Sequence, residues 1–173
     1  TGLDGFICAT GTGGTLAGIT RYLKEKSNGQ VQCWLADPPG SVLHGYVQSK
    51  GAELARTGTG SITEGIGQGR VTSNLRPDID LLDNSLHIED EASIAMVYRM
   101  LDEEGLYIGA SSALNIVAAQ RMAEKLGKGS KVATIICDGA ARYQTRLFSR
   151  KWLESKNLLA AIPERLHRYI ALP

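Results

Sequence analysis

Two kinds of apolar pattern alternate along the first part of the chain. Residues 3–9 and 31–36 are short, mostly apolar and β-prone runs of the kind found in buried strands. Between them, residues 16–26 repeat apolar positions at helical spacing, which predicts a helix that ends at Ser27-Asn28-Gly29. Strand, helix and strand in this order predict a β-α-β unit, which favours a parallel sheet covered by helices.

The second half of the chain predicts two longer helices. Apolar residues at i, i+3, i+4 and i+7 predict an amphipathic helix over residues 91–104, with Asp90 as its N-cap. A second helix follows the small-residue stretch 109–113 and runs to about Leu126. Its inward side chains are expected to be Leu114, Val117, Ala118 and Met122.

Short strands are predicted at residues 86–88 and 106–108, and a longer buried strand at 131–137. Residues 41–77 show no clear periodicity and are expected to form a long loop, which in a compact domain is usually functional. A last helix is expected after Pro163. Together these elements predict an α/β fold with a three-layer, doubly wound parallel sheet.

Composition narrows the function classes. The chain has 173 residues, 43% hydrophobic, which is enough for the core of one ordinary domain. Its 19 Lys and Arg residues balance 18 Asp and Glu residues, so we expect no nucleic-acid partner. No apolar run approaches the roughly 18 residues of a membrane span. Cys8, Cys33 and Cys137 lie in apolar runs without CxxC spacing, so we expect small buried thiols in a reducing compartment and no metal site.

Glycine and threonine are concentrated between the first predicted strand and the first predicted helix, in Thr10-Gly11-Thr12-Gly13-Gly14-Thr15. Glycines let backbone N–H groups turn toward an anion, and the helix N-terminus adds positive potential, so this stretch predicts a phosphate-binding loop. The dinucleotide pattern fails because Leu16 stands where its third glycine belongs. The P-loop pattern fails because Ile19 follows Gly18. A plain strand-to-helix turn is the alternative.

Four stretches, in order, resemble one family. Gly11-Thr12-Gly13-Gly14-Thr15-Leu16-Ala17-Gly18-Ile19 resembles the phosphate loop of the fold type II pyridoxal-phosphate enzymes, and within them that of the cysteine synthases and cystathionine β-synthases. The other matches are Glu64-Gly65-Ile66-Gly67, Gly109-Ala110-Ser111-Ser112 and Cys137-Asp138-Gly139-Ala140-Ala141-Arg142-Tyr143. The long spacer and the tail 151–156 are most similar to the long-form cysteine synthases of fungi and some bacteria.

The resemblance implies pyridoxal 5'-phosphate as the cofactor and a role for each motif. Its phosphate would be held by Gly11, Thr12, Gly13, Gly14 and Thr15. Gly67 would line the cleft, Ser111 would face the pyridine nitrogen, and Asp138 would lie beside the cofactor at a strand end. A hydroxyl at the ring nitrogen fits a moderate electron sink, suited to β-elimination and replacement.

For some residues the sequence leaves a structural alternative open. Ser111, or Ser112 in its place, is also a candidate N-cap, and Asp138 is also a candidate for a local cap or an ion pair with Arg142. The histidines share no motif and are expected to be structural or on the surface. The loop charges Lys50, Arg70 and Arg76 are interpreted as solvated.

In the family that this chain resembles, the Schiff-base lysine and the loop for the substrate carboxylate lie upstream of the phosphate loop. Neither stretch is present here, so the catalytic lysine is not among these residues. We therefore expect residues 1–173 to be the C-terminal, phosphate-binding part of a two-domain enzyme, inactive by itself.

For the whole protein, the resemblance implies formation of L-cysteine from an activated serine, O-acetylserine, and sulfide. The alternatives are replacement of the cystathionine β-synthase type and a non-catalytic module that binds phosphate or a partner protein. The resemblance also implies a homodimer and a mitochondrial or cytoplasmic location.

Overall fold

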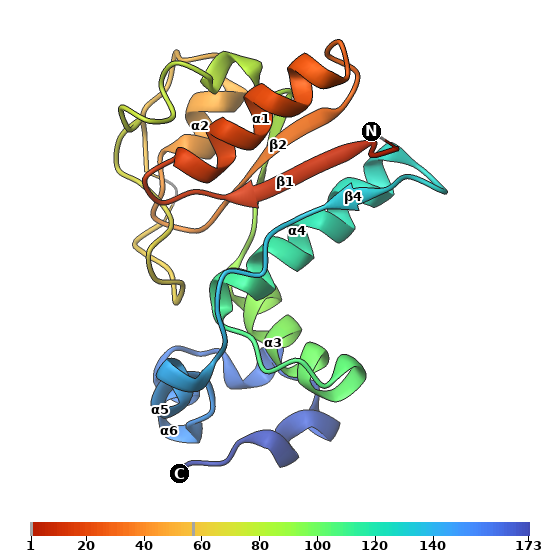
Figure 1. Ribbon diagram of the computed structural model, residues 1–173. Coiled ribbons are helices and arrows are strands. Elements are labelled where there is room, and N and C mark those ends of the chain that lie inside the picture. Colours follow the sequence, from red (N-terminus) through yellow and green to blue (C-terminus); the bar gives the residue numbers. More distant parts are fainter. Residues whose placement is uncertain (1, 57) are drawn as a thin grey trace.

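A parallel sheet of four strands forms the upper part of the molecule in Figure 1. The computed structural model describes residues 2–56 and 58–173. The strands lie in the order β3-β2-β1-β4, and all neighbours are parallel. Their bounds are β1 (Gly5–Ala9), β2 (Gln32–Asp37), β3 (Asn84–His87) and β4 (Val132–Ala133). Because Ala9 pairs with Ala36, β1 and β2 end at the same edge of the sheet.

Alternate side chains of the two central strands enter two separate cores, because successive residues of a strand point to opposite faces. Phe6 and Leu35 pack under α1 (Gly14–Lys26) and α2 (Leu43–Gln48). Ile7 and Trp34 pack against the cluster formed by α3 (Asp90–Glu104) and α4 (Ala110–Leu126). Helices therefore cover both faces of the sheet, and the predicted three-layer α/β fold is confirmed.

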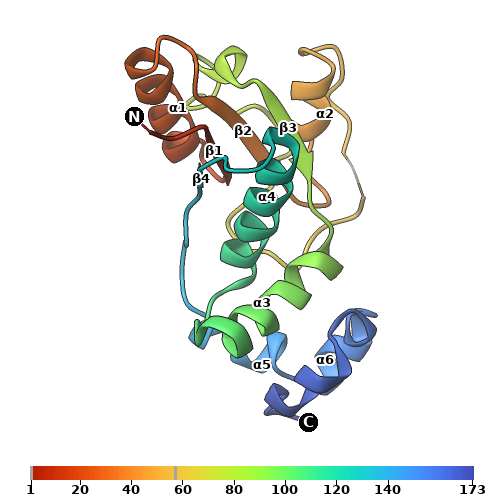
Figure 2. The same ribbon diagram turned by 90° about the vertical axis from the view of Figure 1, so that its right-hand side faces the viewer.

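A second group of helices lies below the sheet in Figures 1 and 2. It contains α3, α5 (Gln144–Leu147), α6 (Arg150–Ser155) and two 3-10 segments, Leu159–Ala161 and Glu164–Tyr169. The long helix α4 connects the two groups, because it packs against both β1 and α3. Within this group, the buried Tyr98 hydroxyl donates to the Leu147 carbonyl at 2.8 Å.

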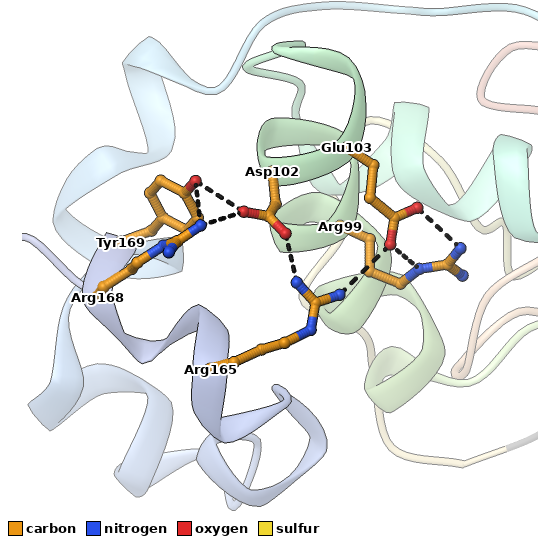
Figure 3. Close-up of polar contacts among 6 residues, drawn as sticks. All are labelled: Arg99, Asp102, Glu103, Arg165, Arg168 and Tyr169. Atoms are coloured by element: carbon orange, nitrogen blue, oxygen red, sulfur yellow. Dashed lines mark hydrogen bonds and ion pairs between the residues drawn. The ribbon is translucent and has the colours of Figure 1, made fainter.

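Charged side chains fasten the C-terminal segment to the end of α3 (Figure 3). Asp102 accepts hydrogen bonds from Arg168 at 2.5 Å and from Tyr169 at 2.8 Å, and it also pairs with Arg165. Tyr169 and the two arginines hold the pKa of the Asp102 carboxyl below its usual range. The helix expected after Pro163 is thus a 3-10 segment anchored by these contacts.

The strand predicted over residues 131–137 is present only as β4, and the prediction is wrong for the residues after Ala133. Asn115, on α4, inserts its amide between β1 and the end of this run. Its Oδ1 accepts from the Ala9 N–H at 2.7 Å, and its Nδ2 donates to the Ile135 carbonyl at 2.9 Å. A side chain therefore takes the hydrogen bonds that a longer strand would have made to β1.

Other expectations need smaller corrections. Residues 106–108 form only an isolated antiparallel bridge, Ile108 with Gly139. Residues 41–77 are not a continuous loop, because they contain α2. The N-cap of α3 is Glu89 and not Asp90, whose carboxylate instead accepts from Ser61 and from the Ile62 N–H.

The remaining elements are the 3-10 segments Ile79–Leu81 and Ala141–Tyr143. None of the helices among the described residues is long and apolar enough to cross a membrane.

Candidate functional site

The glycine-rich loop joins the carboxyl end of β1 to the N-terminus of α1, as the sequence predicts. Gly13 is the N-cap of α1 and has a φ of 93°, a left-handed conformation that glycine adopts without strain. Within residues 2–56 and 58–173, the backbone N–H groups of residues 11–16 have no hydrogen-bond acceptor. These free donors at a helix N-terminus form a site for an anion such as a phosphate group.

Close packing explains why two positions in the loop, Gly11 and Gly13, and one position beside it, Gly67, are glycines. A Cβ on Gly11 would collide with the carbonyl oxygen of Gly65, and one on Gly13 would lie 2.7 Å from Leu75 Cβ. Gly67 also has a left-handed φ, 79°, and a Cβ there would lie 2.8 Å from Pro38 Cγ. The Gly67 N–H donates to the Thr10 carbonyl at 3.2 Å. The stretch 64–67 therefore lies directly against the glycine loop.

A cavity of about 160 Å³ opens at this loop. It is lined by residues 8–15, which include Gly11, Thr12, Gly13, Gly14 and Thr15, and by side chains from three other segments: Ile66, Asn115, Ile135 and Cys137. The structure thus brings the first predicted motif together with Ile66 of the second motif and Cys137 of the fourth. Gly67, Ser111 and Asp138 do not line this cavity.

Ser111 is the second residue of α4, and its side chain is 7% exposed. The N-cap of α4 is Gly109 and no side chain caps this helix, so the alternative of Ser111 or Ser112 as N-cap is wrong. Burial raises the pKa of the Cys137 thiol overall, and Ser111, which lies close to this thiol, partly offsets the shift. Ser111 also lines a small enclosed pocket with Tyr143 and Arg146. Cys137 lines the glycine-loop cavity, so Ser111 is near that cavity without lining it.

Ser112 and Asp138, which lie near Ser111, are hydrogen-bonded to each other. The Ser112 hydroxyl donates to the Asp138 carbonyl at 3.1 Å and accepts from the Cys137 N–H at 2.9 Å. The Asp138 carboxylate accepts from the Tyr143 hydroxyl at 2.6 Å, which raises the pKa of Tyr143. Among the described residues it makes no ion pair with Arg142, so that alternative is wrong. A Cβ on Gly109 would collide with Asp138 Oδ1, so this turn requires glycine.

The sequence did not point to Asn115, although it is fully buried and lines the cavity. Besides its bonds to β1 and to Ile135, its Nδ2 lies 3.5 Å from Cys137 Sγ. The signal that was available is an amide among the inward-facing apolar residues of α4. A buried polar side chain has to find hydrogen-bond partners, and here the partners are the two chain segments that form the cavity wall.

Ser41 and Asp37 hold the 64–69 stretch in place, and the sequence did not point to them either. The buried Ser41 hydroxyl donates to the Gln68 carbonyl at 3.1 Å and accepts from the Gln68 N–H at 3.0 Å. Asp37, at the carboxyl end of β2, lies close to Ser41 and accepts from the His44 N–H at 2.7 Å. Burial raises the pKa of Asp37 to about 6, and Ser41 and two α2 N–H groups partly offset the shift.

Cys8 and Cys33 are buried, as predicted, but Cys137 is exposed. The reason is the interruption by Asn115, which leaves residues 134–137 outside the regular sheet. Partial burial, together with the charge of Asp138, still raises the pKa of the Cys137 thiol, although Ser111 and Ser112 lower it.

Cys137 is therefore expected to be the thiol that reacts with a disulfide reagent in the native protein, since the other two are at most 1% exposed. Pyridoxal phosphate should slow this reaction, because Cys137 lines the glycine-loop cavity. Thiol titration with and without the cofactor measures both effects, and Cys137→Ser identifies the residue. Equal reaction rates with and without the cofactor would show that pyridoxal phosphate does not bind in this cavity.

The chain belongs to the family of pyridoxal-phosphate dependent enzymes, whose model matches residues 1–138. The family and the cofactor expected from the sequence are thereby confirmed. Cysteine synthase 1 of Neurospora crassa is 68% identical over 171 residues, which cover 99% of this chain and 45% of that protein. Cysteine synthase 1 of Emericella nidulans is 67% identical over 171 residues, with 99% and 46% covered. The chain thus spans about half the length of the curated relatives it matches.

A solved structure shares the fold. It is the O-acetylserine dependent cystathionine beta-synthase from Helicobacter pylori, with a TM-score of 0.68 and 31% sequence identity. The similarity covers 84% of this chain and 43% of that one.

Proposed function

We propose that residues 1–173 form the C-terminal, cofactor-phosphate-binding part of a two-domain enzyme that makes L-cysteine from O-acetylserine and sulfide. The observation that carries the proposal is the row of free backbone N–H groups at the start of α1, in a chain 68% identical to a cysteine synthase. A homodimer and a mitochondrial or cytoplasmic location belong to the same proposal.

The residues present fit the phosphate end of pyridoxal phosphate. The N–H groups of residues 11–15 would donate to the phosphate oxygens, the Thr12 and Thr15 hydroxyls would add donors, and the dipole of α1 would favour the negative charge. No acidic side chain lines this cavity among the described residues. When bound, the cofactor supplies the electron sink for β-elimination and for addition of the sulfur nucleophile.

Ser111 would face the pyridine nitrogen, with Ser112 and Asp138 as its support. A serine hydroxyl offers this nitrogen a neutral hydrogen bond and does not hold a proton on it as a carboxylate would. Asp138 would act on the cofactor indirectly, by positioning its neighbours. Its carboxylate accepts from the Tyr143 hydroxyl, and its carbonyl accepts from the Gly109 N–H at 3.1 Å. Gly67, packed on Thr10, would shape the cleft beside the substrate.

A second candidate is replacement with homocysteine as the nucleophile, which forms cystathionine. The similarity to the Helicobacter pylori structure favours it. The two candidates share the elimination step and differ in the nucleophile that follows, so one assay separates them.

The test measures product formation by the full-length protein from O-acetylserine with sulfide or with homocysteine. Sulfide is expected to be the better nucleophile, and residues 1–173 alone are expected to be inactive. Ser111→Ala should lower kcat roughly tenfold, about 1.4 kcal/mol in the barrier, whereas Ser155→Ala, at an exposed position of α6, should match the wild type. Turnover by residues 1–173 alone, or a preference for homocysteine, would contradict the proposal.

A further inference from the structure

A second and larger cavity adjoins the glycine loop at Thr12. It measures about 440 Å³, which lies within the range of small-molecule sites. Its other wall is the segment 68–76, which includes Arg70 and Arg76. None of the residues assigned above to the cofactor lines it except Thr12.

The wall that carries the two arginines is anchored to the body of the protein. Val71 is 6% exposed and Leu75 is fully buried in the core under α1. The Thr72 hydroxyl donates to the Thr12 carbonyl at 2.7 Å, and the Arg76 N–H donates to the Thr72 carbonyl at 3.0 Å. Because these contacts fix the backbone, Arg70 and Arg76 start from defined positions on the cavity wall.

The charge of this wall is not balanced by nearby acids. Among residues 2–56 and 58–173, neither Arg70 nor Arg76 makes an ion pair. Asp78, two residues after Arg76, is held by Arg21 through bonds of 2.9 and 2.6 Å. No acidic residue of the described chain lines the cavity. Other arginines of the molecule differ, since Arg146 pairs with Glu64 and Arg165 with Asp102.

We infer that this cavity is a second anion site, which binds a small molecule carrying two or more negatively charged oxyanion groups. Each guanidinium presents a planar fork of N–H donors that matches a carboxylate or a phosphate. Gln68, Ser73 and Asn74, which also line the cavity, offer amide and hydroxyl groups to the remaining oxygens. The solvated loop charges expected from the sequence are, on this inference, ligand-binding groups.

The size of the cavity and the two separate cations set the ligand class. Two guanidinium groups that make no ion pair favour a ligand with two acidic groups over a single small monoanion. Carboxylates and phosphates share the required chemistry, so citrate and inorganic pyrophosphate, which both carry more than one acidic group, are suitable probes. The site is distinct from the glycine-loop cavity, because Arg70 and Arg76 do not line that cavity and Thr12 is the lining residue that the two share among the described residues.

The test is calorimetric titration of citrate and of inorganic pyrophosphate into the full-length protein saturated with pyridoxal phosphate, at constant ionic strength. Saturable binding of at least one probe is expected, and the probe that binds more tightly distinguishes carboxylate from phosphate. The double variant Arg70→Gln, Arg76→Gln should lose at least tenfold in affinity. Lys151→Gln, which removes one positive charge from an exposed position of α6, should bind as the wild type.

Both arginines are exposed, so the double variant should keep the wild-type thermal midpoint. If it does not fold, Arg70→Lys and Arg76→Lys keep the charge but lose the planar fork, and each should weaken binding several-fold. Non-saturable heats in the wild type would overturn the inference. Wild-type affinity in a folded double variant, or in both lysine variants, would overturn it as well.

Discussion

Replacing Gly14 with aspartate is expected to abolish retention of pyridoxal phosphate without unfolding the protein. Gly14 is the first residue of α1, and a Cβ there meets nothing within 4 Å. An acidic residue in the first turn is compatible with the helix, but its charge would occupy the site of the phosphate. Two unit charges about 4 Å apart repel by about 4 kcal/mol at an effective dielectric of about 20, so we expect a loss of at least 100-fold in affinity.

Absorbance of the cofactor after dialysis of the full-length protein measures this loss. Gly18→Asp is the matched control, because Gly18 lies further along α1 and its Cβ position is also open. Gly13→Asp is a poorer probe, because φ is 93° there and the side chain would strike Leu75 and Thr72, so folding itself would suffer. A folded Gly14→Asp protein that keeps its cofactor would show that the glycine loop does not bind the cofactor phosphate.

Replacing Ser41 with alanine is expected to lower the free energy of unfolding by about 3 kcal/mol and to loosen the stretch 64–69. The variant loses the bonds to both backbone groups of Gln68 and the bond from the Leu43 N–H at 3.3 Å. Each such bond contributes about 1 kcal/mol, and the groups left behind are buried at Leu43 and half-buried at Gln68. Urea unfolding measures the stability, and hydrogen exchange at the Gln68 amide measures the loosening.

The effect of Ser41→Ala should also depend on pH. Burial raises the pKa of Asp37 to about 6 from its usual 3.8, so keeping this carboxyl buried costs stability above pH 6. That cost disappears as the pH falls through 6 toward 4, because the carboxyl is then neutral. The nearby Ser41 hydroxyl lowers the pKa of Asp37 and so favours the charged form. Removing it should therefore destabilise the protein more above pH 6 than below it.

Ser155→Ala is the control for both measurements. Its exposed hydroxyl donates only to the Trp152 carbonyl, at 2.7 Å, so the change should stay within about 0.5 kcal/mol at every pH. A Ser41→Ala variant with wild-type stability and wild-type exchange at Gln68 would show that α2 and the 64–69 stretch are held by other contacts.

Local patterns were sufficient for the elements that set up the glycine loop. The apolar periodicity of residues 16–26 and 91–104 predicts α1 and α3 to within two residues, because a helical face depends on spacing along one segment. The glycine loop could likewise be predicted from the sequence, because it depends on a turn within a few residues. Gly13, with its left-handed φ, makes this turn and leaves the N–H groups at the start of the helix free.

The residues that build the walls of the site depend on contacts between distant parts of the chain. Asn115 binds the Ala9 N–H across 106 positions of sequence, and this one amide shortens β4 and exposes Cys137. Ser41 reaches Gln68 across 27 positions. Periodicity carries no information about such partners, because a buried polar side chain is satisfied by whichever backbone group the packed fold brings to it. The sequence by itself determined the α/β order, the glycine loop and the family. Only the tertiary structure decided which side chains hold that loop in place, and that Arg70 and Arg76 share a cavity beside it.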